Sequence, residues 1–172
     1  MVQVQQIAGA RHSDICRVYD AHARHGAAPV TTAYDVERWA GLLGAAYLDT
    51  PDMSEMPEVR HIWQQFAREV EAQFVSLLKA GFRFEFTHDD PVNPATGKPD
   101  MLYLYEKLMI TGTLPVYIGD SDNPLLGARR FWYDSQYISA NDMFRAVHDI
   151  LGHMISGAEF NFRDEVLAYQ YH

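Results

Sequence analysis

The sequence has few of the features that mark disulfide-bonded, nucleic-acid-binding or membrane-spanning proteins. Its one cysteine, Cys16, has no partner for an intramolecular disulfide and lacks the paired spacing of a thiolate zinc site. Lys and Arg number 14 against 23 Asp and Glu, which gives a net charge of −9. Because phosphate backbones are bound by clustered cations, this balance disfavours nucleic acid as a partner.

Long apolar runs and targeting signals are also lacking. No apolar run approaches the roughly 20 residues needed to span a bilayer, so we expect no membrane partner. The segment Met1–Gln6 lacks the basic and apolar stretches of a secretory signal, which favours a cytoplasmic location. The 172 residues are 48% hydrophobic, enough for one core, and predict a single domain over 1–172.

The spacing of apolar residues predicts a mainly α fold, a helical domain with a small two-stranded β element. Apolar residues recur at three- and four-residue steps through 55–80, and the following Gly81 suits a helix end. Alternation predicts strands at 82–87 and 114–118, separated by a helix at 100–110, which allows the strands to pair in parallel. Further helices are predicted at 12–24, 33–49, 141–152 and 163–172, with an irregular segment at 120–140.

Two histidines in the C-terminal segment 141–172 are the first candidates for metal binding. His148 and His153 offer imidazole, the commonest protein ligand for zinc and non-haem iron. On an ideal helix five residues advance roughly 500°, so the two side chains diverge by about 140°. Shared ligation therefore requires the helix to end or loosen near Gly152, and a regular helix through residue 155 would count against the site.

A carboxylate for the same site is offered by the following predicted helix. Glu165 and His172 are seven residues apart, two helical turns, so they share a face. If this helix packs antiparallel to the preceding one, Glu165 completes a set of two histidines and one carboxylate, typical of non-haem Fe(II) enzymes. Zinc or manganese are the alternative metals. His172 is then either a fourth ligand or a base beside the metal.

Two families resemble this segment. Val147–His153 reads Val-His-Asp-Ile-Leu-Gly-His and resembles the His-Asp-x-x-Gly-His stretch of the aromatic amino acid hydroxylases, in which both histidines and a later glutamate bind iron. The longer run from Asn141 through Glu165 to His172 is similar to a group of bacteriophage-encoded proteins and phage polyvalent-protein domains, as is the turn at Asn123-Pro124. The second resemblance implies a phage origin, a location inside a bacterial host and a metal site.

Neighbouring charged residues suggest further roles. Asp149 is a candidate catalytic residue or a partner that orients a metal-bound imidazole. The alternatives are an exposed helix acid and a member of a His-Asp pair of the phosphohydrolase type. Arg145 precedes His148 by three residues on nearly the same face and is a candidate for binding an anionic substrate, with a surface salt bridge as the alternative. The alternative for the two histidines, which we favour less than metal ligation, is that they are buried residues satisfied by Asp149 and backbone carbonyls. The alternative for Glu165 is a solvated helix charge.

Three functions are compatible with these residues. The first is a non-haem iron oxygenase that hydroxylates a small or nucleotide-derived substrate, with His148, His153 and Glu165 as ligands. The second is a zinc- or manganese-dependent hydrolase in which Glu165 or His172 is the general base. The third is a non-catalytic phage accessory protein. The resemblance to the hydroxylases favours the first, and the sequence does not indicate the oligomeric state.

Overall fold

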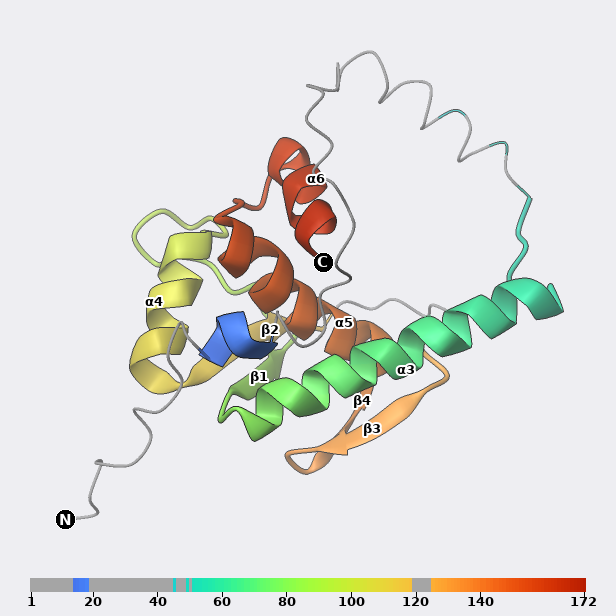
Figure 1. Cartoon of the computed structure of the whole chain (residues 1–172). Coiled ribbons are helices and arrows are strands. Elements are labelled where there is room, and N and C mark those ends of the chain that lie inside the picture. Colours follow the sequence, from blue (N-terminus) through green and yellow to red (C-terminus); the bar gives the residue numbers. More distant parts are fainter. Residues whose placement is uncertain (1–13, 19–44, 46–48, 50, 119–124) are drawn as a thin grey trace.

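The computed structural model describes residues 14–18, 45, 49, 51–118 and 125–172 (Figure 1). Helices dominate, and the strands form two small two-stranded sheets, which confirms the predicted fold class. No helix in these ranges is long and apolar enough to cross a membrane. The elements are α3 (Pro57–Lys79), β1 (Arg83–Thr87), α4 (Met101–Thr111), β2 (Thr113–Tyr117), β3 (Arg130–Tyr133), β4 (Gln136–Ser139), α5 (Ala140–His148), the π-helix η1 (Asp149–Met154) and α6 (Phe162–Tyr171).

The long helix α3 covers one side of the core. It begins with Pro57 at its first turn, where proline loses no hydrogen bond, and the chain turns away at Gly81 with φ of 100°. Its buried face is made of Ala67, Val70, Phe74 and Leu77. The helix predicted at 55–80 is therefore confirmed, and its apolar stripe packs against α5.

Both predicted strands of the first sheet are present. β1 and β2 pair in parallel, with Phe84 opposite Leu114, and α4 connects them. Asp100 begins α4 by accepting a hydrogen bond from the backbone N–H of Tyr103, and Gly112 ends it with φ of 71°. This sheet lies behind α3 in Figure 1, and β2 also packs against α5.

The prediction of an irregular segment at 120–140 is wrong for its second half. β3 and β4 form an antiparallel hairpin whose turn residues, Asp134 and Ser135, have φ of 44° and 66°. Asp and Ser are less common than glycine at such positions, so the sequence carried no strong turn signal. The hairpin is joined to β1 because the Tyr133 hydroxyl accepts a hydrogen bond from the backbone N–H of Phe84 at 2.9 Å.

Aromatic side chains from three elements meet around Phe74. Phe84 and Phe86 of β1 and Phe131 and Tyr133 of β3 all have ring centres within 6.3 Å of its ring. Phe131 and Tyr133 therefore pack into the core, and this packing fixes α3 relative to the sheets.

The two C-terminal helices carry the candidate site. Ser139 starts α5 with a capping box, because its hydroxyl accepts from the N–H of Asp142 and the Asp142 carboxylate accepts from the N–H of Ser139. α6 begins at its cap Asn161 and packs against η1, and Figure 1 shows it beside the end of α5. The helices predicted at 141–152 and 163–172 are thus present.

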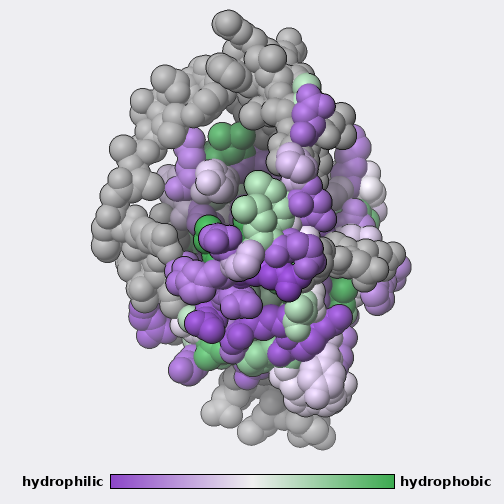
Figure 2. Space-filling model, turned by 90° about the vertical axis from the view of Figure 1, so that its right-hand side faces the viewer, coloured by the Kyte–Doolittle hydropathy of each residue, from purple (hydrophilic) through white to green (hydrophobic). Residues whose placement is uncertain are grey.

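Part of the prediction lies outside the described residues. The predicted helix at 33–49 falls almost wholly there, and of the one at 12–24 only residues 14–18 are described, all helical. Hydrophilic residues cover most of the described surface in the view of Figure 2, with hydrophobic residues scattered among them.

Candidate metal centre

The helix that carries both histidines changes its winding between them. α5 ends at His148 and continues as the π-helix η1, in which each backbone N–H bonds to the carbonyl five residues earlier. This wider turn brings residues five apart onto the same side, so it removes the divergence of an ideal helix. The predicted loosening near Gly152 is confirmed. The helix does not end there, however, but stays helical through Ser156.

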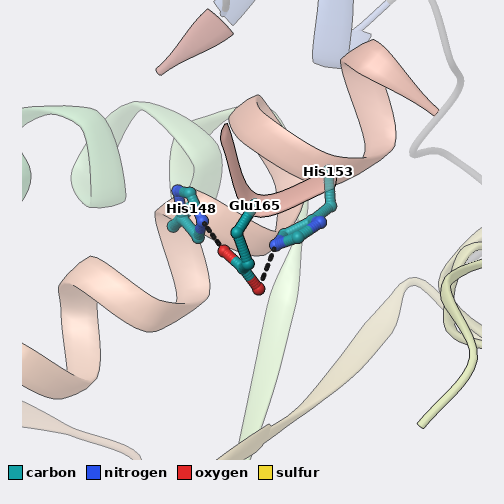
Figure 3. A group of neighbouring side chains, drawn as sticks. All are labelled: His148, His153 and Glu165. Atoms are coloured by element: carbon teal, nitrogen blue, oxygen red, sulfur yellow. Dashed lines mark hydrogen bonds and ion pairs between the residues drawn. The ribbon is translucent and has the colours of Figure 1, made fainter. Parts of the chain in front are cut away.

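The Glu165 carboxylate lies between the two imidazole rings (Figure 3). Its Oε2 is 3.4 Å from Nε2 of His148 and its Oε1 is 3.4 Å from Nε2 of His153. One ligand atom from each residue lies within 4.8 Å of the others. A metal bound at about 2.0–2.2 Å separates its donors by about 2.8–3.6 Å, so the two His–Glu separations suit shared ligation.

His153 presents a lone pair to this carboxylate. Its Nδ1 lies 3.0 Å from the carbonyl oxygen of Ala158, which can only accept, so Nδ1 carries the hydrogen. Nε2 of the neutral ring is then an acceptor, and it faces an acceptor oxygen of Glu165. His153 is 1% exposed, so water does not separate the two groups freely. Two acceptors facing each other repel unless a cation or a proton lies between them, and this makes the position suitable for a metal.

A chain of hydrogen bonds orients His148 in the same way. The Gln73 amide oxygen accepts from Nε2 of His172 at 3.2 Å, which leaves Nδ1 of His172 as an acceptor. That atom lies 3.4 Å from Nδ1 of His148, which therefore donates. Nε2 of His148 is left with its lone pair toward Glu165. His172 thus contacts the far side of the His148 ring and does not join the group of three ligand atoms.

The environment keeps these imidazoles neutral. Burial lowers the pKa of His148, the nearby His153 lowers it further, and Glu165 partly opposes this. Burial and the neighbouring His148 lower the pKa of His172 to about 4. A neutral His148 ring can bind a metal, and a neutral His172 ring can accept the hydrogen bond from Nδ1 of His148.

Gly152 lets the His148 ring and α6 approach η1 closely. A Cβ at this position would lie 3.0 Å from Nδ1 and 3.1 Å from Cε1 of His148, and 3.2 Å from the carbonyl oxygen of Ala168. Gly152 therefore leaves room for the imidazole ring of His148, which a larger residue in the π-helix would not.

A cavity of about 260 Å³ opens beside these residues. Its lining includes His148, His153 and Glu165, the polar residues Asp90, Tyr117, Arg145 and Asp149, and the apolar residues Leu104, Val116, Phe144 and Phe160. The Glu165 side chain is 47% exposed, so the group is reachable from solvent.

Asp149 and Arg145 belong to this cavity in different ways. Among the described residues Asp149 makes no hydrogen bond to either imidazole, because the two Nδ1 atoms face Ala158 and His172. Burial raises the pKa of Asp149 to about 7, Glu165 adds to this and Arg145 opposes it. The Arg145 guanidinium carbon lies 5.5 Å from the centre of the Tyr117 ring.

Comparison with known proteins adds no assignment. No protein-family model, no curated protein and no solved structure matches this chain. The sequence did not suggest Gln73 and Tyr117 as residues of the site. They precede His148 by 75 and 31 residues, so no local spacing indicates them.

Proposed function

We propose that this chain is a metal-dependent enzyme, and that it hydroxylates a small substrate with non-haem Fe(II) bound by His148, His153 and Glu165. The observation that carries the proposal is the convergence of two Nε2 lone pairs on one carboxylate, each 3.4 Å from a different oxygen. Three protein ligands on one side of an octahedral ion leave positions open for dioxygen and water. The adjoining cavity then holds the substrate.

The donor types argue against a structural zinc site, which is closed by four ligands, often thiolates. Two imidazoles and one carboxylate are the set that non-haem Fe(II) oxygenases use, and catalytic zinc sites use the same set. The His-Asp-x-x-Gly-His run that resembles the aromatic amino acid hydroxylases supports the choice of iron. The similarity of the longer run from Asn141 to His172 to bacteriophage proteins supports a role in the cytoplasm of a bacterial host.

In this proposal the other residues act around the ligands. Bound iron would supply the activation of dioxygen, with one oxygen atom entering a substrate C–H bond. The second oxygen atom leaves as water, for which a two-electron organic reductant is needed. Asp149, which is among the residues that line the cavity, would exchange a proton with bound substrate. His172 holds the orientation of His148 through the hydrogen bond between their Nδ1 atoms.

One observation favours a second candidate, a metal-dependent hydrolase. Asp149 lines the same cavity as the three ligands, so it can serve as general base for a water on zinc or manganese. The hydrolase would use the same three ligands as the oxygenase. The two candidates differ in the metal that is bound and in the reaction that is catalysed. A non-catalytic phage accessory protein, in which the histidines brace the fold, is the third.

Metal analysis tests the proposal directly. Protein purified without chelator and reconstituted anaerobically with Fe(II), Zn(II) or Mn(II) is expected to bind one Fe(II) per chain and to consume dioxygen when a reductant is present. His148→Ala, His153→Ala and Glu165→Ala should each lower the bound metal. His61→Ala is the matched control, because His61 is exposed on α3 and contacts Gln65.

Each other outcome assigns the protein differently. Tight binding of zinc or manganese without consumption of dioxygen would favour the hydrolase. A protein that binds none of the three metals would be the accessory protein. If His148→Ala and His153→Ala both leave the bound metal unchanged, the ligand assignment is wrong.

A further inference from the structure

The cavity beside the candidate ligands contains one cation, Arg145, among its lining residues. Arg145 lies on α5 three residues before His148, so the two side chains leave the helix on neighbouring positions of one face. A ligand that spans the cavity can therefore contact both the guanidinium group and the metal position.

The Arg145 guanidinium is held without being neutralised. Its central carbon lies 5.5 Å from the centre of the Tyr117 ring, within the range of a cation–π contact. Such a contact uses the planar face of the group and leaves its N–H edge free to donate. Among the described residues, no Asp or Glu oxygen lies within 4.0 Å of it, although Asp149 is near enough to sense its charge.

The remainder of the lining limits what this cation can bind. Asp90, Asp149 and Glu165 also line the cavity, and the lining has no Lys and no second Arg. A dianionic phosphate would meet three acids with one guanidinium to bind it. A carboxylate carries a single charge and matches one guanidinium with two parallel hydrogen bonds.

The walls indicate the rest of the ligand. Leu104, Val116, Phe144 and Phe160 are apolar, and the Phe160 ring centre lies 4.7 Å from that of His153. The volume of about 260 Å³ is below the roughly 300–1,000 Å³ of pockets that hold drug-sized ligands. The occupant is therefore small and partly apolar.

We infer that the substrate of this site is a small organic acid with an apolar or aromatic body, and that Arg145, held by Tyr117, binds its carboxylate. This inference rests on the proposed function, because it identifies the substrate of the same cavity. It places the carboxylate at Arg145 and the body between the apolar walls and the metal position.

Binding of matched probes tests the inference. 3-Phenylpropanoate, its uncharged amide and phenyl phosphate are titrated by calorimetry into the full chain, once metal-free and once loaded with Co(II). The acid is expected to bind more tightly than either analogue. Arg145→Gln should weaken binding of the acid by about 10- to 100-fold and leave binding of the amide and of Co(II) within about twofold.

Two further variants separate the contact from general charge. Tyr117→Phe keeps an aromatic face and should bind the acid as tightly as the unmodified chain. Tyr117→Leu should weaken binding of the acid by about two- to fivefold. Arg130→Gln removes an exposed arginine of β3 and is the control for net charge. Arg130→Gln should bind the acid as tightly as the unmodified chain.

The results that overturn the inference differ from those that overturn the proposed function. Equal binding of acid and amide, tighter binding of phenyl phosphate, or an unchanged affinity of Arg145→Gln for the acid would each refute the role of Arg145. If the affinity is unchanged only in the Co(II)-loaded protein, the carboxylate binds the metal instead of Arg145. Failure to bind Co(II), with selective binding of the acid retained, would refute the metal centre and leave the carboxylate site standing.

Discussion

Replacing Gly152 with alanine is the sharpest test of how the fold creates the candidate metal centre. The new Cβ would lie 3.0 Å and 3.1 Å from two atoms of the His148 ring and 3.2 Å from the carbonyl oxygen of Ala168. Carbon atoms at optimal packing are about 3.5–4.0 Å apart, so the three contacts are short of that range by about 0.3–0.5 Å. Both neighbours are constrained, because one is a ring whose Nδ1 also contacts His172 and the other is backbone.

The expected cost has two opposing parts. Overpacking of this kind costs about 1–3 kcal/mol, whereas alanine in place of glycine stabilises a helix by about 1 kcal/mol. The free energy of unfolding should therefore fall by only about 0–2 kcal/mol. Affinity for metal should fall by more, about 10- to 100-fold, because the ring that moves carries a ligand atom.

Two assays and one control separate these effects. Urea unfolding of the metal-free protein measures stability, and competition titration with Co(II) or Zn(II) measures affinity. Gly97→Ala is the control, because Gly97 has φ of 68° and open space around its Cα. It should lose about 1–2 kcal/mol through backbone strain and keep its metal affinity.

A double-mutant cycle with His148→Ala completes the test. In that background part of the overpacking penalty should disappear, because the ring that the new methyl group meets is gone. If Gly152→Ala binds metal as tightly as the unmodified chain, the close approach does not position His148 and the reasoning fails.

Three further predictions follow from the same structure. Replacing His172 with Phe or Gln73 with Leu removes a member of the hydrogen-bond series that orients His148. Either change should weaken metal binding by about 10- to 100-fold while one equivalent still binds at saturation. Unchanged affinity in both variants would show that these hydrogen bonds are not needed for metal binding. Ser139→Ala removes the cap of α5 and should lower the free energy of unfolding by about 1 kcal/mol in urea, with Ser139→Thr as the variant that keeps the capping hydroxyl. Hydrogen bonds from the Tyr103 backbone and then the Asn93 side chain lower the pKa of Asp100 from 3.8, so its contribution to stability is present above that pH and is lost as pH falls through the lower folded value. Asp100→Asn should therefore lose less stability than the unmodified chain between neutral pH and pH 3; parallel curves would contradict this.

The sequence predicted the elements whose residues are periodic. α3 and α4 and the strands β1 and β2 appear within two residues of their predicted bounds, because each carries a complete apolar pattern and ends at glycine or turn residues. The β3–β4 hairpin was missed, because its turn at Asp134 and Ser135 has no glycine and its pairing depends on contact with β1 through Tyr133. Strand pairing of that kind is decided by distant residues.

The sequence by itself determined the chemistry that His148, His153 and Glu165 can offer, and the five-residue spacing showed that a regular helix would keep the two rings apart. Only the tertiary structure decided how that conflict is resolved, through a π-helix that aligns the histidines and through α6, which places Glu165 between them. It also decided the orientation of each ring, because the acceptors that fix their hydrogens come from Ala158 and, through His172, from Gln73 on α3. The physical reason is that a residue's type sets which atoms can bind a metal, whereas the direction of a lone pair is set by whatever packs against the other side of the ring.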